Sequence, residues 1–526
     1  MRAASRECAF ARRVVGRGAV GKGAPGWLLP GVALVWLLLL AAGPSLALGV
    51  EPSESPEPPV SLGGFQRHVD ELLPRHGLDK AHTALLLFST RHRAYLYRHA
   101  VKRPMIPASN VKLFTTYAAL KELSPDFRWN TNMYLFEEHH DGGAAPRQGL
   151  LVVGSGDPTW NQAHLDRAAL YIRSSGVGRL EAGIHFDGRL FDEVRFPASW
   201  GDVSRSEPWF APVSPFIVNE NVVEFLIAKR EGTQIFDVFS PAPGMEIVSL
   251  LRESAVDKPS VRVEQNWEKD GATFTFQGSL APAKEPYTLQ AAVERPRVWF
   301  YRHLARGLRR AGVKGEIPLR EGPLPKGPRR LIYSRKSPPL REVMVEVNKH
   351  SSNLTAEILL RTMGLRNKTE GVSSQDGLEV LREVVEADFP EAAEQLSLVD
   401  GSGLSRENRV TAYLMVRLLN RVRFQSSFRP EFVNSLSVAM TDGTLQYRYF
   451  PWNLRGRVRA KSGTLKGVTN LSGYLEMPGD TVIFSMLINH PGRGYQDLQQ
   501  AQDHFLGDVY GALRTLYAPP ATASEP

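Results

Sequence analysis

The stretch Ser109-Asn110-Val111-Lys112 has the spacing S-x-x-K, and two further short motifs follow it in a fixed order. These are Ser351-Ser352-Asn353, an S-x-N, and Lys461-Ser462-Gly463-Thr464, a K-[ST]-G. An active serine whose base is a lysine rather than a histidine needs these three motifs. S-x-x-K alone is a weak signal, so the prediction of a serine acyl-transfer site depends on all three together.

The first motif is expected at the start of a helix. Ile106-Pro107-Ala108 ends an extended approach, and an apolar run of helical spacing begins at Ser109. Positions i and i+3 share a helix face, so Lys112 can reach Ser109 and, with a lowered pKa, act as its base. Backbone amides at the helix start can meet a developing oxyanion. The alternative is a helix cap followed by a surface lysine.

The other two motifs are also expected on suitable elements. Ser351 and Asn353 precede an amphipathic helix, where the alternative is an ordinary N-cap. Lys461–Thr464 lies between two strand-like segments, and Gly463 would let a substrate backbone approach the edge strand. The alternative for this motif is a strand with a kink.

The spacing of the motifs predicts an inserted segment. Ser109 and Ser351 are 242 positions apart, so most of the intervening chain must leave the catalytic domain and return to it. Residues 222–285 contain alternating strand patterns without a strong helix, which favours a small β-module. We therefore expect a catalytic domain of residues 62–125 and 296–526, an inserted α/β domain of 126–221 and 286–295, and a nested β-rich module of 222–285.

The N-terminal residues have the pattern of a targeting segment. Six Lys or Arg residues precede an apolar run from Trp27 to about Leu40, and small residues follow at Ser45-Leu46-Ala47. This order is typical of a secretory signal peptide, here residues 1–47, although an uncleaved membrane anchor is the alternative. The Pro- and Glu-rich residues 48–61 are expected to form a tether. The chain is therefore predicted to be exported, to a periplasmic or other extracytoplasmic location, with possible membrane association.

Charge and cysteine content narrow the functional classes. The formal charge is +9, of which +5 lies in residues 1–47, so the mature chain is too mildly basic to favour nucleic acid. The only cysteine, Cys8, lies in the predicted signal peptide, which argues against disulfides, thiol catalysis and Cys-based zinc sites. The run Glu137-Glu138-His139-His140-Asp141 is expected to be a solvated hairpin tip rather than a metal site, and no cofactor is expected.

The motifs and several loops closely resemble the class C low-molecular-mass penicillin-binding proteins, the D-alanyl-D-alanine carboxypeptidase/endopeptidase family. The resemblance covers nearly all of residues 60–526. It implies an α/β (α+β) domain of the serine β-lactamase/transpeptidase type, with an antiparallel sheet flanked by helices and split by two inserted smaller domains. The loops that carry it are Gly156-Asp157-Pro158-Thr159, Asp400-Gly401-Ser402-Gly403-Leu404-Ser405-Arg406 and Asn470-Leu471-Ser472-Gly473.

The resemblance implies a serine D,D-peptidase that acts on D-Ala-D-Ala termini or D,D cross-links of peptidoglycan stem peptides and is acylated by β-lactams. It assigns the catalytic roles to Ser109 as nucleophile, Lys112 as its base, Ser351 and Lys461 as the proton relay, and Asn353 as the residue that holds Lys112 and the substrate amide. It assigns substrate binding to Ser462, Gly463, Thr464, Arg406 and Asp202. The amides of Ser109 and Thr464 would form the oxyanion hole.

Three positions depart from the usual pattern of that family. K-S-G replaces the commoner K-T-G, which keeps the hydroxyl but loses the methyl group that restrains its rotamer. Ser352 stands where an Asp is frequent, and Lys466 stands where a Gln is often found. The competing functions are a serine β-lactamase or esterase and a penicillin-binding wall protein without turnover. The sequence leaves the oligomeric state open.

Overall fold

The computed structural model describes residues 61–139, 145–201, 206–230, 233–239, 241–253, 260–268, 271–280 and 286–517. The predicted signal peptide, nearly all of the predicted tether and the predicted substrate-binding residue Asp202 lie outside these residues. Within them, no helix combines the length and the apolar character needed to cross a membrane.

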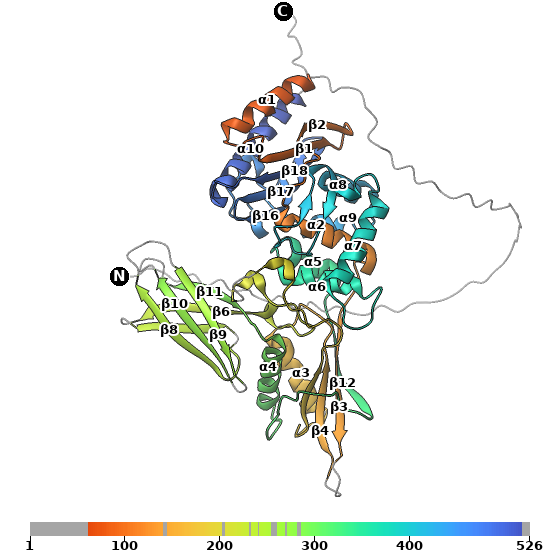
Figure 1. Cartoon of the computed structure of the whole chain (residues 1–526), viewed down its shortest axis with the longest axis vertical. Helices are drawn as coiled ribbons and strands as arrows, with labels where there is room; N and C mark the ends of the chain where they lie inside the picture. Colours follow the sequence, from red (N-terminus) through yellow and green to blue (C-terminus); the bar gives the residue numbers. More distant parts are fainter. Residues whose placement is uncertain are drawn as a thin grey trace, which may run out of the picture. The chain divides into compact units, whose positions relative to one another are not determined.

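The largest sheet has six strands, and every neighbouring pair in it is antiparallel. It joins strands from both ends of the chain, as the discontinuous domain predicted from sequence requires (Figure 1). In spatial order the strands are β15 (Ser437–Val438), β16 (Val458–Leu465), β17 (Val468–Met477), β18 (Asp480–Asn489), β1 (Thr83–Ser89) and β2 (Ala94–His99). The predicted antiparallel sheet is therefore confirmed.

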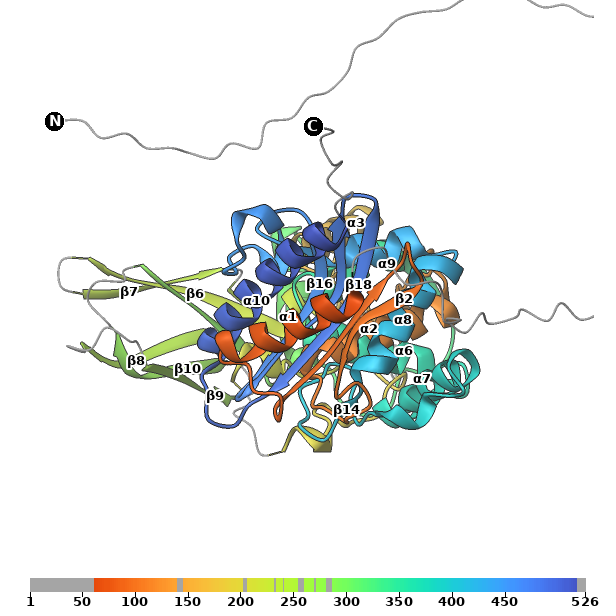
Figure 2. The ribbon, with the colours of Figure 1, turned by 90° about the horizontal axis from the view of Figure 1, so that it is seen from above.

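Strand β1 is buried along its whole length because both faces of this sheet are covered. Successive side chains of a strand point to opposite faces, so Leu85 and Leu87 join one core while Leu86 and Phe88 join the other. Helices α1 (Leu62–Arg75) and α10 (Tyr495–Leu516) cover the first face, where they lie side by side (Figure 2). The helices of the second core are α2 (Val111–Leu123), α5 (Leu340–Asn348), α6 (Asn353–Gly364), α7 (Ser374–Asp388), α8 (Ala412–Gln425) and α9 (Arg429–Ser435).

A second, four-stranded sheet is formed by the chain between the first two motifs, and its order is β12-β3-β4-β5. Helices α3 (Gln162–Ser174) and α4 (Pro296–Arg310) pack together and share a hydrophobic core with it. Pairing of Glu138 with Arg147 confirms the predicted hairpin there, although His140 and Asp141 lie outside the described residues. The strands are β3 (Asn130–Glu138), β4 (Arg147–Val153), β5 (Gly183–Asp187) and β12 (Arg329–Lys336).

The packing corrects one predicted boundary. Residues 296–336 were assigned to the catalytic domain, but α4 packs on α3, and β12 is the antiparallel neighbour of β3. Trp299, Phe300 and Leu304 are buried in the core of the inserted segment, whereas Leu340 and Val343 are the first residues after it to enter the catalytic core. The chain therefore returns to the catalytic domain near residue 337, not at residue 296.

The β-rich segment consists of two three-stranded sheets with the orders β8-β10-β9 and β11-β6-β7. Strand β11 lies in residues assigned to the inserted α/β domain, but it pairs with β6, so this assignment is corrected too. Strand β8 gives little signal in the sequence, because most of its residues are exposed and lack a clear alternation. The strands are β6 (Val222–Arg230), β7 (Thr233–Phe239), β8 (Met245–Glu253), β9 (Ser260–Trp267), β10 (Ala272–Leu280) and β11 (Tyr287–Ala292), and a short pair is formed by β13 (Leu396–Ser397) and β14 (Arg409–Val410).

Candidate active site

Ser109 lies in a single 3-10 turn, η1 (Ala108–Asn110), immediately before α2. The sequence predicted that the helix opens at Ser109, and the structure instead starts α2 two residues later. Ala108 has a φ of 46°, in the left-handed region that costs a non-glycine residue free energy. The surrounding structure must therefore hold this turn in place.

Two glycines let neighbouring backbone segments pack directly against the Ser109 turn. A Cβ on Gly403 would lie 2.0 Å from the carbonyl oxygen of Ala108, and one on Gly463 would lie 2.8 Å from that of Pro107. The side-chain amide of Asn110 donates a hydrogen bond of 3.2 Å to the carbonyl of Lys461 in β16. These contacts bring the 400–406 loop and the K-S-G strand against the serine. Gly463 therefore allows the backbone of the Ser109 turn to pack against β16. The sequence indicated only that this glycine would allow a substrate backbone to approach.

Lys112 is fully buried and is the centre of the polar network. Its Nζ donates to Ser109 Oγ at 3.0 Å, to Asn353 Oδ1 at 2.6 Å and to the carbonyl of Ser402 at 2.5 Å. The first two motifs, 241 positions apart at these residues, therefore meet on one amine. The alternative of a surface lysine is excluded.

Burial lowers the pKa of Lys112 to about 7, although the charges of Asp400 and Glu357 act in the opposite direction. A neutral lysine keeps two N–H donors and gains a lone pair. The two donors can remain on Asn353 and Ser402 while the lone pair accepts the proton of Ser109. This geometry can therefore supply a nucleophile and its base near neutral pH.

Ser351 and Lys461 form the second half of the network. Lys461 is fully buried, and its Nζ donates to Ser351 Oγ at 3.0 Å and to the carbonyl of Ser462 at 3.0 Å. Burial lowers the pKa of Lys461 well below its ordinary value, and the charge of Lys112 lowers it further. Ser351 has a φ of 62°, a strained backbone conformation for a residue other than glycine. In this conformation its hydroxyl lies next to Lys461 Nζ. The structure thus joins the S-x-N and K-S-G motifs.

Ser352, between the two predicted site residues of its motif, is the N-cap of α6. Its Oγ accepts a hydrogen bond from the amide of Thr355 at 3.2 Å and donates one to Glu220 Oε2 at 3.0 Å. The N-cap alternative considered for Ser351 and Asn353 is therefore wrong, because Ser352 is the capping residue. Asn353 instead divides its amide between Lys112 and the carbonyl of Trp209 at 2.9 Å.

The predicted substrate-binding residues differ in how far they are exposed. Ser462 is buried, with its hydroxyl 2.7 Å from Thr444 Oγ1, whereas Thr464 is exposed further along β16. Arg406 is exposed and donates to the carbonyl of Lys466 at 2.9 Å, in the turn that follows β16. The structure therefore brings Arg406 to the end of the K-S-G strand.

One buried acid, Glu357, was missed by the sequence analysis. Its Oε1 accepts hydrogen bonds of 2.9 Å from the amides of both Gly401 and Ser402, so it holds the loop residue whose carbonyl binds Lys112. Asp400 fixes the same loop by accepting from the amides of Gly403 and Ser405, both at 2.7 Å. A charged residue on the apolar side of α6 was the available signal.

Substitution of Glu357 by glutamine is expected to change how stability depends on pH. Burial and the charge of Asp400 raise the pKa of Glu357 to about 7 in the folded protein. The folded state then keeps a proton that the unfolded state releases near pH 4.5, so the wild type loses stability as the pH rises from about 4.5 to 7. Relative to the wild type, Glu357→Gln should gain about 1–3 kcal/mol of unfolding free energy across this range.

Denaturant unfolding at pH 5 and pH 7 measures this difference. Glu342→Gln, at an exposed position of α5, is the matched control and should follow the wild type. Parallel pH dependences of Glu357→Gln and the wild type would contradict the assignment.

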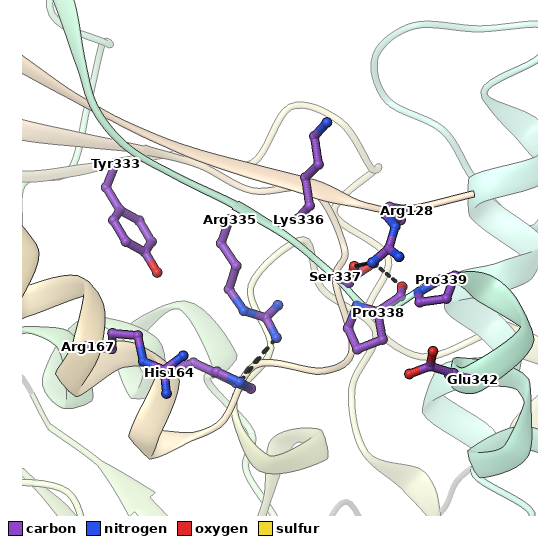
Figure 3. A pocket seen from close by; sticks show the side chains of 10 residues that line it. All are labelled: Arg128, His164, Arg167, Tyr333, Arg335, Lys336, Ser337, Pro338, Pro339 and Glu342. Atoms are coloured by element: carbon purple, nitrogen blue, oxygen red, sulfur yellow. Dashed lines mark hydrogen bonds between the residues drawn. The ribbon is translucent and has the colours of Figure 1, made fainter. Parts of the chain in front are cut away.

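A cavity of about 390 Å³ lies away from these residues, and none of the side chains that line it belongs to the predicted site (Figure 3). Arg335 points into it from β12, but its guanidinium is paired with the buried carboxylate of Asp157. Lys336 points the opposite way from Arg335, as alternate residues of a strand do. Arg335 is neutralised by Asp157, and Arg128 and Arg167 are exposed to solvent. The positive charges around this cavity are therefore accounted for without a ligand.

Comparisons with known proteins identify the family of the chain. A family model described as the D-Ala-D-Ala carboxypeptidase 3 (S13) family matches residues 65–509. A D-alanyl-D-alanine carboxypeptidase of Actinomadura sp. (strain R39) is 29% identical over 518 residues, which cover 95% of this chain and 93% of that protein. The D-alanyl-D-alanine carboxypeptidase DacB of Haemophilus influenzae is 25% identical over 400 residues, covering 73% of this chain and 80% of that protein.

The fold has a counterpart among solved structures. The crystal structure of penicillin-binding protein 4 (dacB) from Haemophilus influenzae has a TM-score of 0.70 at 20% identity, covering 84% of this chain and 99% of that one. The predicted fold class and the resemblance to class C penicillin-binding proteins are thereby confirmed. The chain belongs to the D-Ala-D-Ala carboxypeptidase 3 (S13) family.

Proposed function

We propose that this protein is an exported serine D,D-peptidase that cleaves the D-Ala-D-Ala terminus of peptidoglycan stem peptides through an acyl-Ser109 intermediate. The observation that carries the proposal is the convergence of three motifs on two buried lysines, with Lys112 bound to Ser109 and Lys461 bound to Ser351. Family membership supports the reaction, and the relatives named above are D-alanyl-D-alanine carboxypeptidases.

In the proposed acylation, neutral Lys112 takes the proton of Ser109 Oγ as that oxygen attacks the carbonyl carbon of the penultimate D-Ala. The amides of Ser109 and Thr464 hold the oxyanion, as in other acyl-transfer sites. Ser351 gives its proton to the nitrogen of the leaving D-Ala and is reprotonated through Lys461, which in turn takes up the proton that Lys112 removed from Ser109, so that Lys112 is neutral again. The C–N bond then breaks, and a covalent ester on Ser109 remains.

Water completes the proposed cycle by attacking the ester carbonyl, with Lys112 accepting its proton and returning one to Ser109. Ser462 and Lys461 are proposed to bind the terminal carboxylate of the substrate, since a hydroxyl and an ammonium both donate to carboxylate oxygens. Arg406 is proposed to contact the distal part of the stem peptide, together with Asp202.

The test is incubation of the purified full chain with a short acyl-peptide ending in D-Ala-D-Ala, followed by quantification of free D-Ala. Continuous release that stops after addition of benzylpenicillin is the expected result. Release of cross-linked dimers as monomers, in a parallel muropeptide digestion, would assign endopeptidase activity to the same site. Hydrolysis of benzylpenicillin without D-Ala release would instead identify a β-lactamase, and a stable adduct without any turnover would identify a penicillin-binding wall protein.

A further inference from the structure

The turn Asp442-Gly443-Thr444, at the start of η7 (Gly443–Leu445), belongs to none of the three motifs but contacts the K-S-G motif and the residues just before the S-x-N motif. The amide of Thr444 donates to the carbonyl of Lys349, two residues before Ser351, at 3.0 Å. The hydroxyl of Ser462 in the K-S-G motif donates to Thr444 Oγ1 at 2.7 Å. The turn therefore connects the S-x-N segment with the K-S-G strand.

The backbone of this turn is tightly packed, so Thr444 can position the Ser462 hydroxyl that it contacts. Gly443 has a φ of 56°, and a Cβ there would lie 2.4 Å from Ser437 Oγ and 2.7 Å from the carbonyl oxygen of Lys349. The side chains of Asp442 and Lys349 form an ion pair across the turn. Only glycine fits this position, so Thr444 has little freedom to move relative to the S-x-N segment.

A serine at position 462 depends more on a hydrogen-bond partner such as Thr444 than the threonine of the commoner K-T-G motif would. A threonine at this position has a methyl group that restricts its χ1 rotation, whereas a serine hydroxyl can occupy all three staggered positions. The bond to Thr444 selects one of them. We propose that Thr444 is a positioning residue that holds the Ser462 hydroxyl in place for the terminal carboxylate of the substrate, and this inference rests on the proposed D,D-peptidase function.

The hydroxyl groups around Thr444 can support this task. Thr444 Oγ1 and Ser437 Oγ lie 3.3 Å apart, and Ser437 Oγ donates to the carbonyl of Lys349 at 3.3 Å. Hydroxyl protons rotate to suit their partners. When a carboxylate binds, Thr444 can donate to Ser462 Oγ, so that the proton of Ser462 points to the carboxylate. Thr444 itself is exposed, which places it at the open side of the site.

The experiment compares Thr444→Val, Thr444→Ser and the wild type on two substrates, an acyl-peptide ending in D-Ala-D-Ala and its C-terminal amide. Valine keeps the shape of threonine but removes the hydroxyl. We expect Thr444→Val to raise KM for the carboxylate substrate about 3- to 10-fold, with little change for the amide, and Thr444→Ser to restore the wild-type value. Thr441→Val is the control, because the Thr441 hydroxyl bonds only the nearby carbonyl of Ala439 among the described residues.

A second background separates positioning from a structural role. In Ser462→Thr the methyl group restrains the hydroxyl, so adding Thr444→Val should cost less than half of its effect in the wild-type background. The inference is overturned if Thr444→Val matches the wild type, if both substrates lose activity equally, or if the effect is unchanged by Ser462→Thr. A wild-type protein that cleaves neither substrate, releasing neither D-Ala from the acid nor D-alaninamide from the amide, would instead overturn the proposed function.

Discussion

Replacing Ser109 by alanine is expected to abolish covalent labelling by benzylpenicillin and to lower D-Ala release by roughly 10⁴-fold or more. The acyl-enzyme forms on the Ser109 oxygen, which alanine lacks. Without this oxygen the base has no proton to remove, so the contribution of both residues is lost together. Lys112, Asn353 and Ser402 remain in contact in this variant, since their hydrogen bonds do not involve the serine. The loss is therefore expected in the chemistry rather than in the fold.

Intact-mass spectrometry of the full chain after incubation with benzylpenicillin measures the labelling. Ser334→Ala, at an exposed position of β12 in the inserted segment, should be labelled like the wild type. Unchanged thermal unfolding of Ser109→Ala would show that the fold is intact. A full adduct on Ser109→Ala would place the nucleophile elsewhere and contradict the proposed mechanism.

The elements of the catalytic domain could be predicted because their local patterns are strong. Apolar residues recur at helical spacing over 63–75, and residues 83–88 form a strand-like run. These patterns predict a helix and a strand, and the structure has α1 at Leu62–Arg75 and β1 at Thr83–Ser89. The helical pattern of residues 296–311 likewise predicts α4, but the expected domain boundary placed this helix in the catalytic domain, whereas it packs on α3 of the inserted segment. Amphipathic spacing shows that a helix has a buried face, but it does not show which partner covers that face.

In the candidate site, too, contacts between residues close in sequence could be predicted, whereas those made by tertiary packing could not. Ser109 and Lys112 are three residues apart on adjacent turns, so their contact could be predicted from spacing. The positive φ of Ser351 could not, because a serine gives no local sign that its backbone will be left-handed. Glu357 and Thr444 belong to no short motif, and their roles depend on backbone amides and a hydroxyl brought close by tertiary packing.

Replacing Lys112 by methionine is expected to lower the rate of acylation by benzylpenicillin about 10²- to 10⁴-fold, the contribution typical of a general base. Methionine has a similar length but cannot accept the proton of Ser109. In the wild type, the acylation rate should rise with pH through about 7, because only neutral Lys112 can take that proton and burial lowers its pKa to about 7. Lys336→Met, at an exposed residue of β12, should leave both the rate and its pH profile unchanged.

Two buried groups titrate in this range, so the pH profile must be assigned by substitution. The pKa of Glu357 is also raised to about 7, and its charge raises the pKa of Lys112. If Lys112 is the base, Glu357→Gln keeps the rise in acylation rate but moves it to lower pH, whereas Lys112→Met removes it. If Glu357 controls the profile instead, Glu357→Gln removes the rise. Measuring second-order acylation rates of both variants between pH 5 and 9 distinguishes these results, and a rise that persists in Lys112→Met would contradict its role as the base.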